Sequence, residues 1–432
     1  MEEQKRSNDP KASDVKKLTL KEKIELYRQK RREKRYRQDV VFSETITPHN
    51  SCEQEKETVI YRNGVDVRFL IYVIVLLCFG AVMSFSASYV YAEQKYDDSS
   101  YFLVRYIIFA VASILITVPF VIYARPWFWK CFGTVAYIGS IILLLLVPIV
   151  GSDGGGAQRW LDLKIITIQP SEIAKMAVVI MLAFYMSKYE KQITSTHKWG
   201  GNFKYGVLYP GMIFGSICVL VALEKHISGL MIIGMIGIAV MFMGGTRTKW
   251  IFLIIGAIAA AGCLLILVSS YAQDRVNTWL HIEQVDPLGS AWQTLQGLYA
   301  IGSGGIFGVG LGNSRQKYGY VSQPQNDFVF TIICEELGFF GAAFVILMFV
   351  LLVVRGFKIA AKAPDRFTSL MVFGLTFKVA LQVILNIAVV TNSMPNTGIS
   401  LPFFSSGGTS LALQIFEMGI ILSVSRFSTN KK

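Results

Sequence analysis

Long apolar stretches alternate with shorter polar ones along the chain from about residue 67 onward. Ten of these stretches are long enough to cross the ~30 Å hydrocarbon core of a bilayer as helices. They cover about residues 68–90, 102–124, 128–150, 171–187, 206–223, 228–245, 250–271, 328–354, 368–391 and 408–425. The pattern therefore predicts an all-α polytopic membrane protein with ten transmembrane helices and a large extracytoplasmic loop, residues 272–327, between spans 7 and 8.

Basic residues mark one side of this predicted membrane domain. The loops on that side contain Arg125, Lys130, Lys188, Lys191, Lys198, Lys204, Arg247, Lys249, Arg355, Lys358, Lys362 and Arg366. Because cytoplasmic loops carry an excess of Lys and Arg, this side is expected to face the cytoplasm. Ten spans place both chain termini on that same side.

The polar ends of the chain define the expected domain boundaries. Residues 1–66 form a basic cytoplasmic arm, expected to be partly disordered, residues 67–427 form the membrane domain, and residues 428–432 form a cytoplasmic tail. Within the arm, Thr19 and Glu22 have the spacing of a helix capping box. The arm is interpreted either as a solvated tail near anionic lipid or as a docking segment for a cytoplasmic partner.

Composition agrees with a membrane protein and disfavours several other classes. Hydrophobic residues make up 53% of the chain and charged residues 16%, and the mean hydropathy is +0.47. The net charge of +13 is explained by the arm and the cytoplasmic loops, so no nucleic-acid partner is expected. The six cysteines and four histidines are dispersed, which disfavours a disulfide framework and a protein-built zinc site. No cleavable signal peptide is expected, since the first apolar stretch begins near Phe69.

Three carboxylates lie where the large loop meets the eighth span. Asp327 stands at the start of the span, and Glu335 and Glu336 lie inside it. Charges at membrane depth usually face a bundle interior or a wet cavity. Helical periodicity places Glu335 within about 80° of Asp327, so these two are expected to share a cavity, while Glu336 takes a partner on another helix. The alternative is that Asp327 only caps the helix.

Cations near the outer ends of two spans form a candidate phosphate site. Arg105 lies early in the second span, Arg159 lies in the loop before the fourth, and Lys175 lies in the fourth. Arginine forks match phosphate oxygens and lysine adds a point charge. Glu172 and Lys175 share a helix face at i,i+3 spacing, and a purely structural ion pair is the alternative for those two.

Several other polar features have structural interpretations. His226 is expected to be a satisfied turn residue rather than a catalyst, and Lys378 and Glu417 a buried structural pair rather than a proton relay. The glycine-rich run 302–312 lacks the GxxxxGK[ST] pattern, so a nucleotide P-loop is disfavoured. Loop 392–407 either lines a wet cavity or packs as a re-entrant hairpin.

Three separated motifs resemble those of the shape, elongation, division and sporulation (SEDS) family of membrane proteins. They are GAQRWLDL and IQPSEIAK within 156–175, GVGLGNSRQK and NDFVFTIICEELG within 308–338, and the run 386–408, which ends in TGISLPFFSSGG. The arm before residue 66 lies outside the resemblance. Two stretches depart from the family pattern: EKHISG at 224–229 replaces a QPDxG-like turn, and SQPQN at 322–326 replaces a proline–glutamate pair.

The resemblance implies a peptidoglycan glycosyltransferase that polymerises lipid II at the outer face of the bacterial cytoplasmic membrane. It implies a class B penicillin-binding protein and other division or elongation proteins as partners. Asp327 matches the family's essential carboxylate, and its polar cavity positions match Arg105, Arg159, Glu172, Lys175, Gln293, Lys317 and Ser406. A divalent cation, Mg²⁺ or Mn²⁺, that is not caged by the protein is compatible with this chemistry. A lipid II flippase and a non-catalytic scaffold remain as alternatives, and the motifs do not distinguish division, elongation and sporulation.

Overall fold

The computed structural model of the chain describes residues 60–62, 64–153, 158–162, 167–194, 202–224, 226–268, 270–282, 289, 291–322, 324–405 and 407–429. The chain divides into a terminal unit, Met1–Tyr61 with Thr429–Lys432, and a membrane unit, Arg62–Ser428. The predicted capping box at Thr19 and Glu22 lies outside the described residues. The candidate site lies entirely in the membrane unit.

Apolar helices occupy all ten stretches predicted to span the membrane. Eight are long and apolar enough to cross it: α2 (Val67–Tyr96), α3 (Tyr101–Tyr123), α4 (Pro126–Val150), α5 (Pro170–Lys188), η1 (Lys204–Leu208) continued by α7 (Tyr209–Leu223), α12 (Val329–Ala361), α13 (Arg366–Val390) and α14 (Gly408–Ser425). Two are shorter: α8 (Ile227–Met243) and the Thr248–Leu264 part of α9 (Thr248–Val268). Eight spans are thus supported by length, and crossing by α8 and α9 stays a prediction.

Short elements complete the described chain. They are β1 (Ile60–Arg62), β2 (Ser152–Asp153), β3 (Gln158–Asp162), β4 (Thr167–Ile168), α6 (Glu190–Thr194), α10 (Ser270–Leu280), α11 (Trp292–Gly304) and β5 (Phe427–Thr429). β2, β3 and β4 form an antiparallel sheet in that order, with Leu161 opposite Ile168. The all-α prediction missed this sheet because strands of two to five residues are too short to give a clear alternating pattern.

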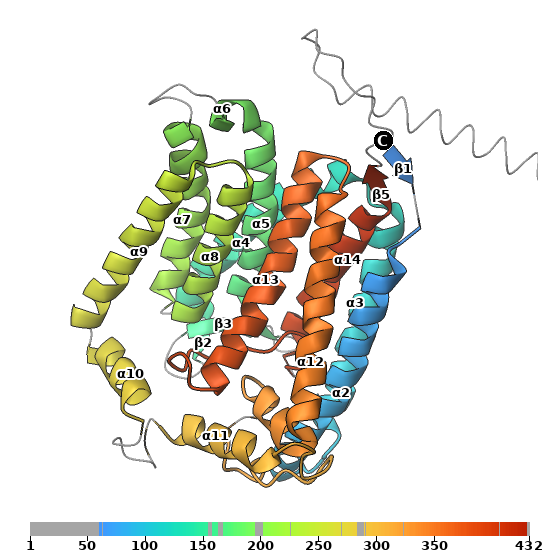
Figure 1. The fold of residues 1–432 in the computed structure, drawn as a ribbon, viewed down its shortest axis with the longest axis vertical. Coiled ribbons are helices and arrows are strands. Elements are labelled where there is room, and N and C mark those ends of the chain that lie inside the picture. The colour runs from blue at the N-terminus through green and yellow to red at the C-terminus, as the bar shows by residue number, and fades with distance from the viewer. Residues whose placement is uncertain are drawn as a thin grey trace, which may run out of the picture. The chain divides into compact units, whose positions relative to one another are not determined.

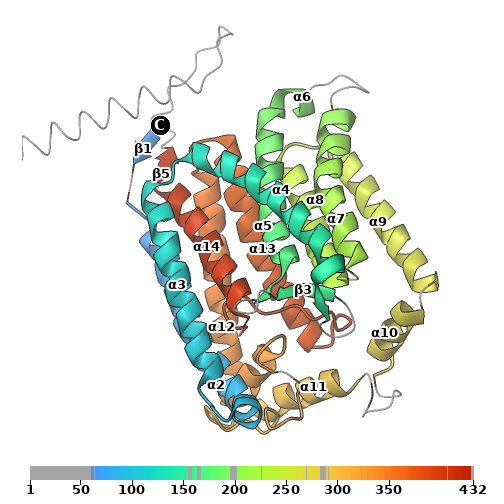
Figure 2. The same ribbon diagram turned by 180° about the vertical axis from the view of Figure 1, so that it is seen from behind.

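The centre of the membrane unit is formed by α5, α13 and α14. In each of these helices 67% of the most apolar window is buried, against 17% in α3. α13 packs against α5, α8 and α12, and α14 packs against α3, as Figures 1 and 2 show from opposite sides. Apolar side chains that point outward, such as Leu115 and Ile149, suit contact with lipid tails.

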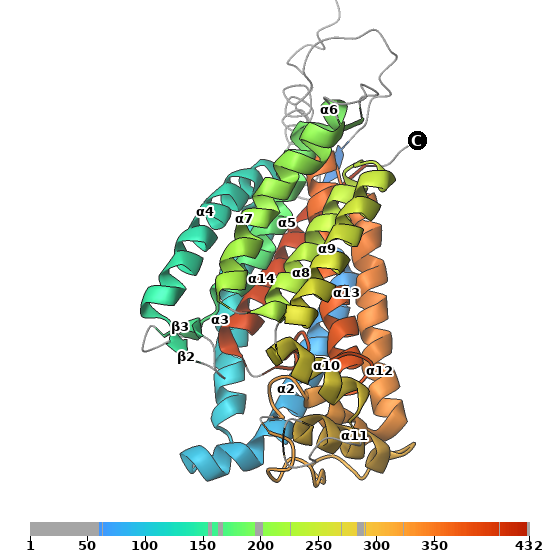
Figure 3. The same cartoon turned by 90° about the vertical axis from the view of Figure 1, so that its left-hand side faces the viewer.

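The two ends of the membrane unit differ in character. One end, here called the loop end, carries α10, α11 and the sheet β2–β4; the other, here called the basic end, carries α6 and the short connections α8–α9 and α12–α13 (Figures 1 and 3). Lys188, Lys204, Lys249 and Lys362 all lie at or next to helix termini of the basic end. The charge asymmetry read from the sequence therefore corresponds to two distinct ends of the bundle.

A glycine clamp holds a bend in α12. Gly338 interrupts the helix with φ +63°, and the freed carbonyls of Glu335 and Glu336 accept hydrogen bonds of 3.0 Å from the backbone N–H groups of Val309 and Gly310. A Cβ atom on Gly308 would lie 2.2 Å from the Glu336 carbonyl oxygen. Gly304 and Gly308 thus serve close backbone approach to α12, which favours a structural role for this run over a phosphate cradle.

Candidate functional site

Asp327 lies at the loop end, immediately before α12, against the loop that joins α13 to α14. The side-chain amide of Asn386 donates to the main-chain carbonyls of Asp327, at 2.8 Å, and of Ile399, at 2.6 Å. A Cβ atom on Gly398 would lie 3.2 Å from the Asp327 Oδ2 atom. The N-cap position of α12 is occupied by Phe328, without a side-chain cap bond. The carboxylate is therefore positioned against loop 392–407 rather than at the cap position.

Burial governs the protonation of this carboxyl group. Asp327 is half-buried, and burial raises its pKa from 3.8 to about 6. The charged form loses hydration in this position. A carboxylate with a raised pKa accepts a proton more readily than an exposed one, which suits a general base near neutral pH.

The two glutamates of α12 turn toward the large loop instead of toward Asp327. Glu335 accepts a hydrogen bond from the Ser314 hydroxyl, which corrects the expectation that Glu335 and Asp327 share a cavity. Glu336 forms an ion pair of 2.8 Å with Lys317, and both side chains are fully buried. The hydroxyl of Ser86 in α2 also donates to Glu336, at 2.6 Å, which confirms the expected partner on another helix.

Lys317 therefore lies in an enclosed cluster rather than at an open polar surface. Its ammonium group donates to Glu336 and, at 2.6 Å, to the Gly312 carbonyl oxygen, and lies 4.6 Å from the centroid of the Tyr89 ring. The glycine clamp folds the large loop back onto the first turns of α12, which brings this lysine to the buried carboxylate. The contacts of Lys317 within the described residues favour a structural role, and its predicted part in substrate binding stays a prediction.

Glu172 and Lys175 form the predicted ion pair on α5, with Lys175 Nζ 2.5 Å from Glu172 Oε1. The lysine is buried and the glutamate lines a cavity of about 10 Å³, together with Ser400 and Ser405 of loop 392–407. That volume suits about one water molecule. Loop 392–407 thus lies next to Asp327 at Gly398 and shares a small cavity with Glu172 at Ser400 and Ser405.

A second group of titratable residues lies beside this ion pair. His226, at the N-cap of α8, lies 3.1 Å from the Ser171 hydroxyl through Nδ1, which confirms the expectation of a satisfied turn residue. Burial, followed by the positive charges of Lys175 and Arg159, lowers the His226 pKa to about 4. The imidazole is therefore neutral at physiological pH, and Arg159 and Lys175 both lie within electrostatic range of it.

Glu224, also in this group, is a buried carboxylate without a hydrogen-bond partner among the described residues. It is 4% exposed, and within the described part of the chain neither carboxylate oxygen has a hydrogen-bond partner. Burial raises its pKa to about 7, and the charge of Arg159 partly opposes that shift. The EKHISG departure therefore places a carboxyl group that titrates near neutrality next to the cationic side of the site.

Arg105 approaches the start of α14 from α3. Its guanidinium group lies 5.7 Å from the centroid of the Phe109 ring, and a Cβ atom on Gly408 would lie 2.5 Å from that ring. Ser406, two residues earlier, lies outside the described residues. The first turn of α14 thus lies close to one of the predicted phosphate-binding cations.

The sheet that carries Arg159 reaches the same turn of α14. The Thr409 hydroxyl donates to the Thr167 carbonyl oxygen at 2.9 Å, and Thr167 belongs to β4, the neighbour of the Arg159 strand β3. Helix N-termini favour anions because their first N–H groups lack helical partners. Phe109, next to Arg105, and Thr167, on the strand beside that of Arg159, both contact the start of α14.

Gln293 fastens the loops around Asp327. Its side-chain amide donates to the Ser322 carbonyl oxygen at 3.1 Å, and its oxygen accepts from Asn396 at 3.3 Å. These bonds connect α11 to the segment before Asp327 and to loop 392–407. Gln293 thus links three segments that surround Asp327.

Lys378 and Glu417 lie deeper in the bundle, with Lys378 Nζ 2.5 Å from Glu417 Oε1 and side-chain exposures of 1% and 0%. The predicted buried pair between α13 and α14 is confirmed. Glu172 and Lys175 also interact electrostatically with Lys378. The ion pair on α5 and the pair between α13 and α14 are thus close enough to interact electrostatically.

Sequence reasoning missed the amides that face the site from α13 and α14. Asn386 anchors Asp327, and Gln382 and Gln414 line the small cavity beside Glu172. One polar atom on each of these amides lacks a hydrogen-bond partner within the described residues. The signal was available, since polar side chains inside apolar spans usually face a bundle interior.

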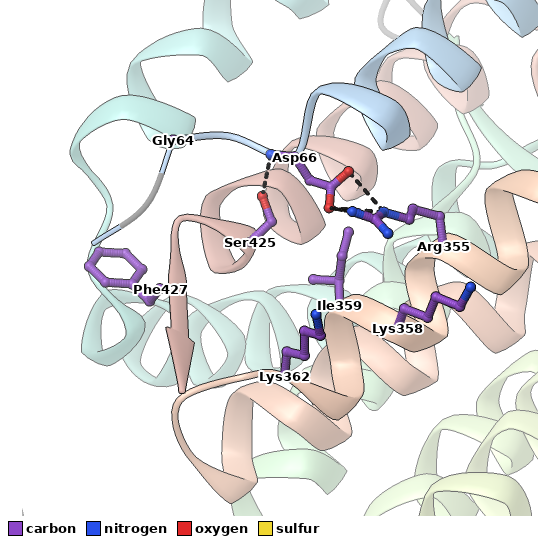
Figure 4. Close-up of a pocket in the computed structure, with 8 residues that line it drawn as sticks. All are labelled: Gly64, Asp66, Arg355, Lys358, Ile359, Lys362, Ser425 and Phe427. Atoms are coloured by element: carbon purple, nitrogen blue, oxygen red, sulfur yellow. Dashed lines mark hydrogen bonds and ion pairs between the residues drawn. The ribbon is translucent and has the colours of Figure 1, made fainter. Parts of the chain in front are cut away.

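Two further features bear on possible ligands. Among the described residues no group of three or more His, Cys, Asp or Glu side chains is arranged to hold a metal ion. A separate cavity of about 200 Å³ lies at the basic end, where Asp66 and Arg355 pair beside Lys358 and Lys362 (Figure 4). It lies at the opposite end of the bundle from Asp327 and takes no part in the candidate site.

Comparison with known proteins covers the whole membrane unit. The family model FTSW_RODA_SPOVE, described as cell cycle protein, matches residues 67–430. Stage V sporulation protein E of Bacillus subtilis (strain 168) is 38% identical over 371 residues, 85% of this chain and 98% of that protein. The probable peptidoglycan glycosyltransferase FtsW of Geobacter sp. (strain M18) is 34% identical over 366 residues, 84% of this chain and 97% of that protein.

Solved structures share the fold. A chain from "Structural coordination of polymerization and crosslinking by a peptidoglycan synthase complex" matches with a TM-score of 0.69 and 24% identity, over 84% of this chain and 98% of that chain. The rod shape determining protein RodA of Thermus thermophilus matches with a TM-score of 0.61 and 23% identity, over 84% and 97% of the two chains. At these identities the likeness establishes the fold alone.

Proposed function

This chain belongs to the FtsW, RodA and SpoVE family of cell cycle proteins, and on that premise we propose that it is a peptidoglycan glycosyltransferase. The family assignment confirms the resemblance found in the three sequence motifs. The proposed reaction polymerises lipid II into glycan strands at the outer face of the bacterial cytoplasmic membrane. Relatives named probable peptidoglycan glycosyltransferase FtsW, at 32% to 35% identity, support this enzyme class.

Loop 392–407 supports the proposal, because it approaches Asp327 at Gly398 and lines a small cavity with Glu172, the ion-pair partner of Lys175. Asn386 ties the Asp327 main chain to this loop, and Glu172 lines a cavity with residues of the same loop. A glycosyl transfer to a hydroxyl needs a base at the acceptor and positive charge at the leaving group. In the proposal Asp327 supplies the base, and Arg105, Arg159 and Lys175 supply the positive charge.

In the proposed mechanism Asp327 accepts the proton of the 4-hydroxyl group of the acceptor sugar. The hydroxyl oxygen forms a bond to the anomeric carbon of the donor, and the bond from that carbon to the pyrophosphate oxygen breaks. Arg105, Arg159 and Lys175 stabilise the negative charge on the departing undecaprenyl pyrophosphate. The lipid tails lie in the membrane beside the spans, which explains why the site is built at the end of a helix bundle.

A divalent cation, Mg²⁺ or Mn²⁺, is compatible with this site. Mg²⁺ is commonly held through one or two carboxylates and the phosphates of a substrate, without a protein cage. Glu172, a carboxylate on the cationic side, would be a ligand together with oxygens of the substrate pyrophosphate. The ion would neutralise charge on the leaving group.

We propose a class B penicillin-binding protein as the partner. One structural neighbour comes from a peptidoglycan synthase complex that coordinates polymerisation and crosslinking, and the family resemblance implies a class B penicillin-binding protein as the partner. Other proteins of the division or elongation machinery are expected to bind as well. Both termini are proposed to lie in the cytoplasm, because the basic end carries the positively charged loops.

The decisive experiment is a polymerisation assay with purified protein, its penicillin-binding partner and lipid II. Asp327→Asn is expected to abolish glycan synthesis while the protein keeps its fold and its partner, and Asp98→Asn, at an exposed carboxylate of the α2–α3 loop, is the matched control. Glycan synthesis by Asp327→Asn at the wild-type rate would overturn the mechanism. Transfer of lipid II between leaflets without glycan synthesis would instead identify a flippase. If every variant that makes no glycan still supports cell growth, the protein would be a scaffold.

A further inference from the structure

A large groove lies on the side of the membrane unit away from the glycosyl transfer site. It has a volume of about 640 Å³ and runs between α4, α5 and α7, three helices that lie side by side in Figure 2. Five tyrosines line it: Tyr137, Tyr185, Tyr189, Tyr205 and Tyr209. All three helices are long and apolar enough to span the membrane, so this tyrosine groove opens toward the bilayer.

The tyrosine groove is about as long as one leaflet is thick. Tyr205 lies at the basic end of the η1–α7 helix, and Ser216, eleven residues further along, lines the other end of the groove. At 1.5 Å per residue this separation is roughly 16 Å along the helix axis. Half of a bilayer core of ~30 Å is about 15 Å. With the basic end at the membrane surface, as proposed above, a groove of this length reaches the middle of the membrane.

Among the described residues, charged side chains lie at only one end of the groove. At the basic end, Lys188 lies 5.4 Å from the centroid of the Tyr189 ring and Lys204 lies 5.7 Å from that of Tyr209. Both lysines are exposed. Toward the membrane middle the lining is uncharged: Ile141, Met212 and Ile213 lie beside Tyr137 and Ser216, whose hydroxyls bond to each other. A phospholipid has the same polarity, with a charged phosphate at the surface and acyl chains below it.

Within the groove, Tyr185 presents an unfilled hydrogen-bonding group. Its hydroxyl is buried and has no partner within the described residues. Tyr137 in the same groove is satisfied by the Ile213 carbonyl oxygen and the Ser216 hydroxyl, each at 2.8 Å. Buried hydroxyls normally have partners, so this donor is available to a ligand oxygen or a water molecule that reaches it.

The charges around the groove favour an anionic ligand. None of its lining residues is acidic, and Glu190, the carboxylate that follows Tyr189 in sequence, lies 3.6 Å from Arg366. Lys188 and Lys204 thus leave a net positive charge at the mouth of the groove. Each lysine near an anionic surface contributes attraction to a lipid phosphate.

From these observations we propose that the tyrosine groove binds one anionic phospholipid of the leaflet at the basic end. Its phosphate lies between Lys188 and Lys204, and the Tyr185 hydroxyl donates to a phosphate or ester oxygen. One acyl chain lies along Ile141, Met212 and Ile213. This site is separate from the proposed glycosyl transfer and does not depend on it.

The test is native mass spectrometry of the full-length protein, exchanged into mixed micelles with either phosphatidylglycerol or phosphatidylcholine. One phosphatidylglycerol molecule is expected to stay bound, and phosphatidylcholine to dissociate. The double variant Lys188→Gln/Lys204→Gln should weaken phosphatidylglycerol retention roughly tenfold. Equal retention of the two lipids by the wild-type protein would overturn the proposal, because the site would then not recognise charge.

A matched control separates this site from the general positive charge of the basic end. Lys358→Gln/Lys362→Gln removes two exposed lysines from the same end, on α12, and should leave retention unchanged. If both double variants lose the lipid equally, surface potential alone explains the binding and the groove has no role. All four lysines are exposed, so these variants are expected to fold normally.

A second variant tests the groove itself without changing charge. Tyr185→Phe removes the free hydroxyl and keeps the ring, so phosphatidylglycerol retention should fall severalfold while phosphatidylcholine retention stays the same. Tyr123→Phe, at a residue that is 79% exposed on α3, is the control. Retention by Tyr185→Phe equal to that of the control would remove this hydroxyl from the site and overturn the proposed lipid position.

Discussion

Asn386 holds Asp327 through its main chain: the side-chain amide of Asn386 donates to the Asp327 carbonyl oxygen at 2.8 Å. The same amide donates to Ile399, so one side chain of α13 sets the distance between the proposed base and loop 392–407. The Asp327 carboxylate is left available for a ligand. This arrangement separates the group that positions the base from the base itself.

Removing that amide should misplace the base. Asn386→Ala is expected to lower the polymerisation rate by about 100-fold, because a shift of about 1 Å in a reacting group has this order of effect. The variant should also unfold about 1–3 kcal/mol more easily, since two buried carbonyl groups lose their donor. Polymerisation kinetics and thermal unfolding in detergent measure the two effects. Ser393→Ala, at an exposed hydroxyl of the same loop, should change neither, and a wild-type rate in Asn386→Ala would refute the positioning role.

The pH dependence of polymerisation should report Asp327. Its pKa is about 6 in the folded protein, and a general base acts only when it is ionised. Activity should therefore rise with pH through about 6 and fall away below it. The measurement is kcat/KM for lipid II between pH 5 and 8, with protein stability checked at each pH. A rate that is unchanged from pH 7 to pH 5 would contradict this assignment.

The stability of Asp327→Asn should follow from the same pKa. The folded state binds a proton at Asp327 up to about pH 6, whereas the ordinary pKa of an aspartate, which applies to the unfolded chain, is 3.8. Ionisation between these pH values therefore disfavours the fold, and a neutral asparagine avoids that cost. Asp327→Asn is expected to have a Tm at pH 7 that is no lower than that of the wild-type protein, so its inactivity cannot be assigned to unfolding. A Tm lower by several degrees would show that the carboxylate has a structural role.

Lys317 should behave as a structural residue. Lys317→Met leaves Glu336 buried without its cation and is expected to cost about 3–5 kcal/mol of stability. The double variant Lys317→Met/Glu336→Gln removes both charges and should recover most of that stability. Thermal unfolding and the polymerisation rate of the folded fraction are the measurements. If the double variant folds but makes no glycan, Lys317 contributes to substrate binding and the structural interpretation is wrong.

The glycine clamp provides a test of the fold around the site. Gly308→Ala should prevent stable folding, because a Cβ atom there would lie 2.2 Å from the Glu336 carbonyl oxygen and φ is +80°. Gly302→Ala is the control, because it lies in α11 with no atom within 4 Å of its added Cβ; it should be neutral or stabilising by up to about 1 kcal/mol. Yield of folded protein and Tm distinguish the two. Equal behaviour of the pair would contradict the clamp.

Asp66 ties two helices together at the basic end (Figure 4). It caps α2 by accepting from the Phe69 N–H at 3.0 Å and pairs with Arg355 of α12 at 2.7 Å. Asp66→Ala should therefore lower stability by about 1–2 kcal/mol, whereas Asp66→Ser, which keeps a cap oxygen, should lose less. Tm measurements on both variants test this ranking, and equal losses would assign the whole effect to the ion pair.

The same contacts make the stabilisation of the fold by Asp66 depend on pH. Burial acts to raise the Asp66 pKa, but the hydrogen bonds and charge of Arg355 outweigh it and hold the pKa below 3.8. The stabilisation is therefore fully present above about pH 4 and is lost as pH falls through the lower folded pKa. The Tm difference between the wild-type protein and Asp66→Ala should shrink in acid. A difference that stays constant down to pH 3 would show that ionisation of Asp66 contributes nothing.

Local pattern was sufficient for the helices and for several pairs of residues. Apolar length predicted all ten helical segments, because a helix in lipid satisfies its own backbone and needs a continuous apolar surface. The i,i+3 spacing predicted the contact of Glu172 with Lys175, because helix geometry alone brings such side chains together. The charge asymmetry of the loops also distinguished the two ends of the bundle, because it depends on position along the chain and not on packing.

Contacts between distant segments were decided only in three dimensions. Helical periodicity turned Glu335 toward Asp327, but the glycine clamp folds residues 305–317 onto α12 and supplies both glutamates with nearer partners. Nothing local to Asn386 indicated that its amide would reach Asp327, 59 residues away in sequence. The sequence alone thus determined which segments are helices and which side chains share a helix face, since these follow from short-range geometry. Only the tertiary structure determined the partner of each buried polar group. Such a group must form a hydrogen bond or ion pair, and its partner comes from the distant segment that packs against it.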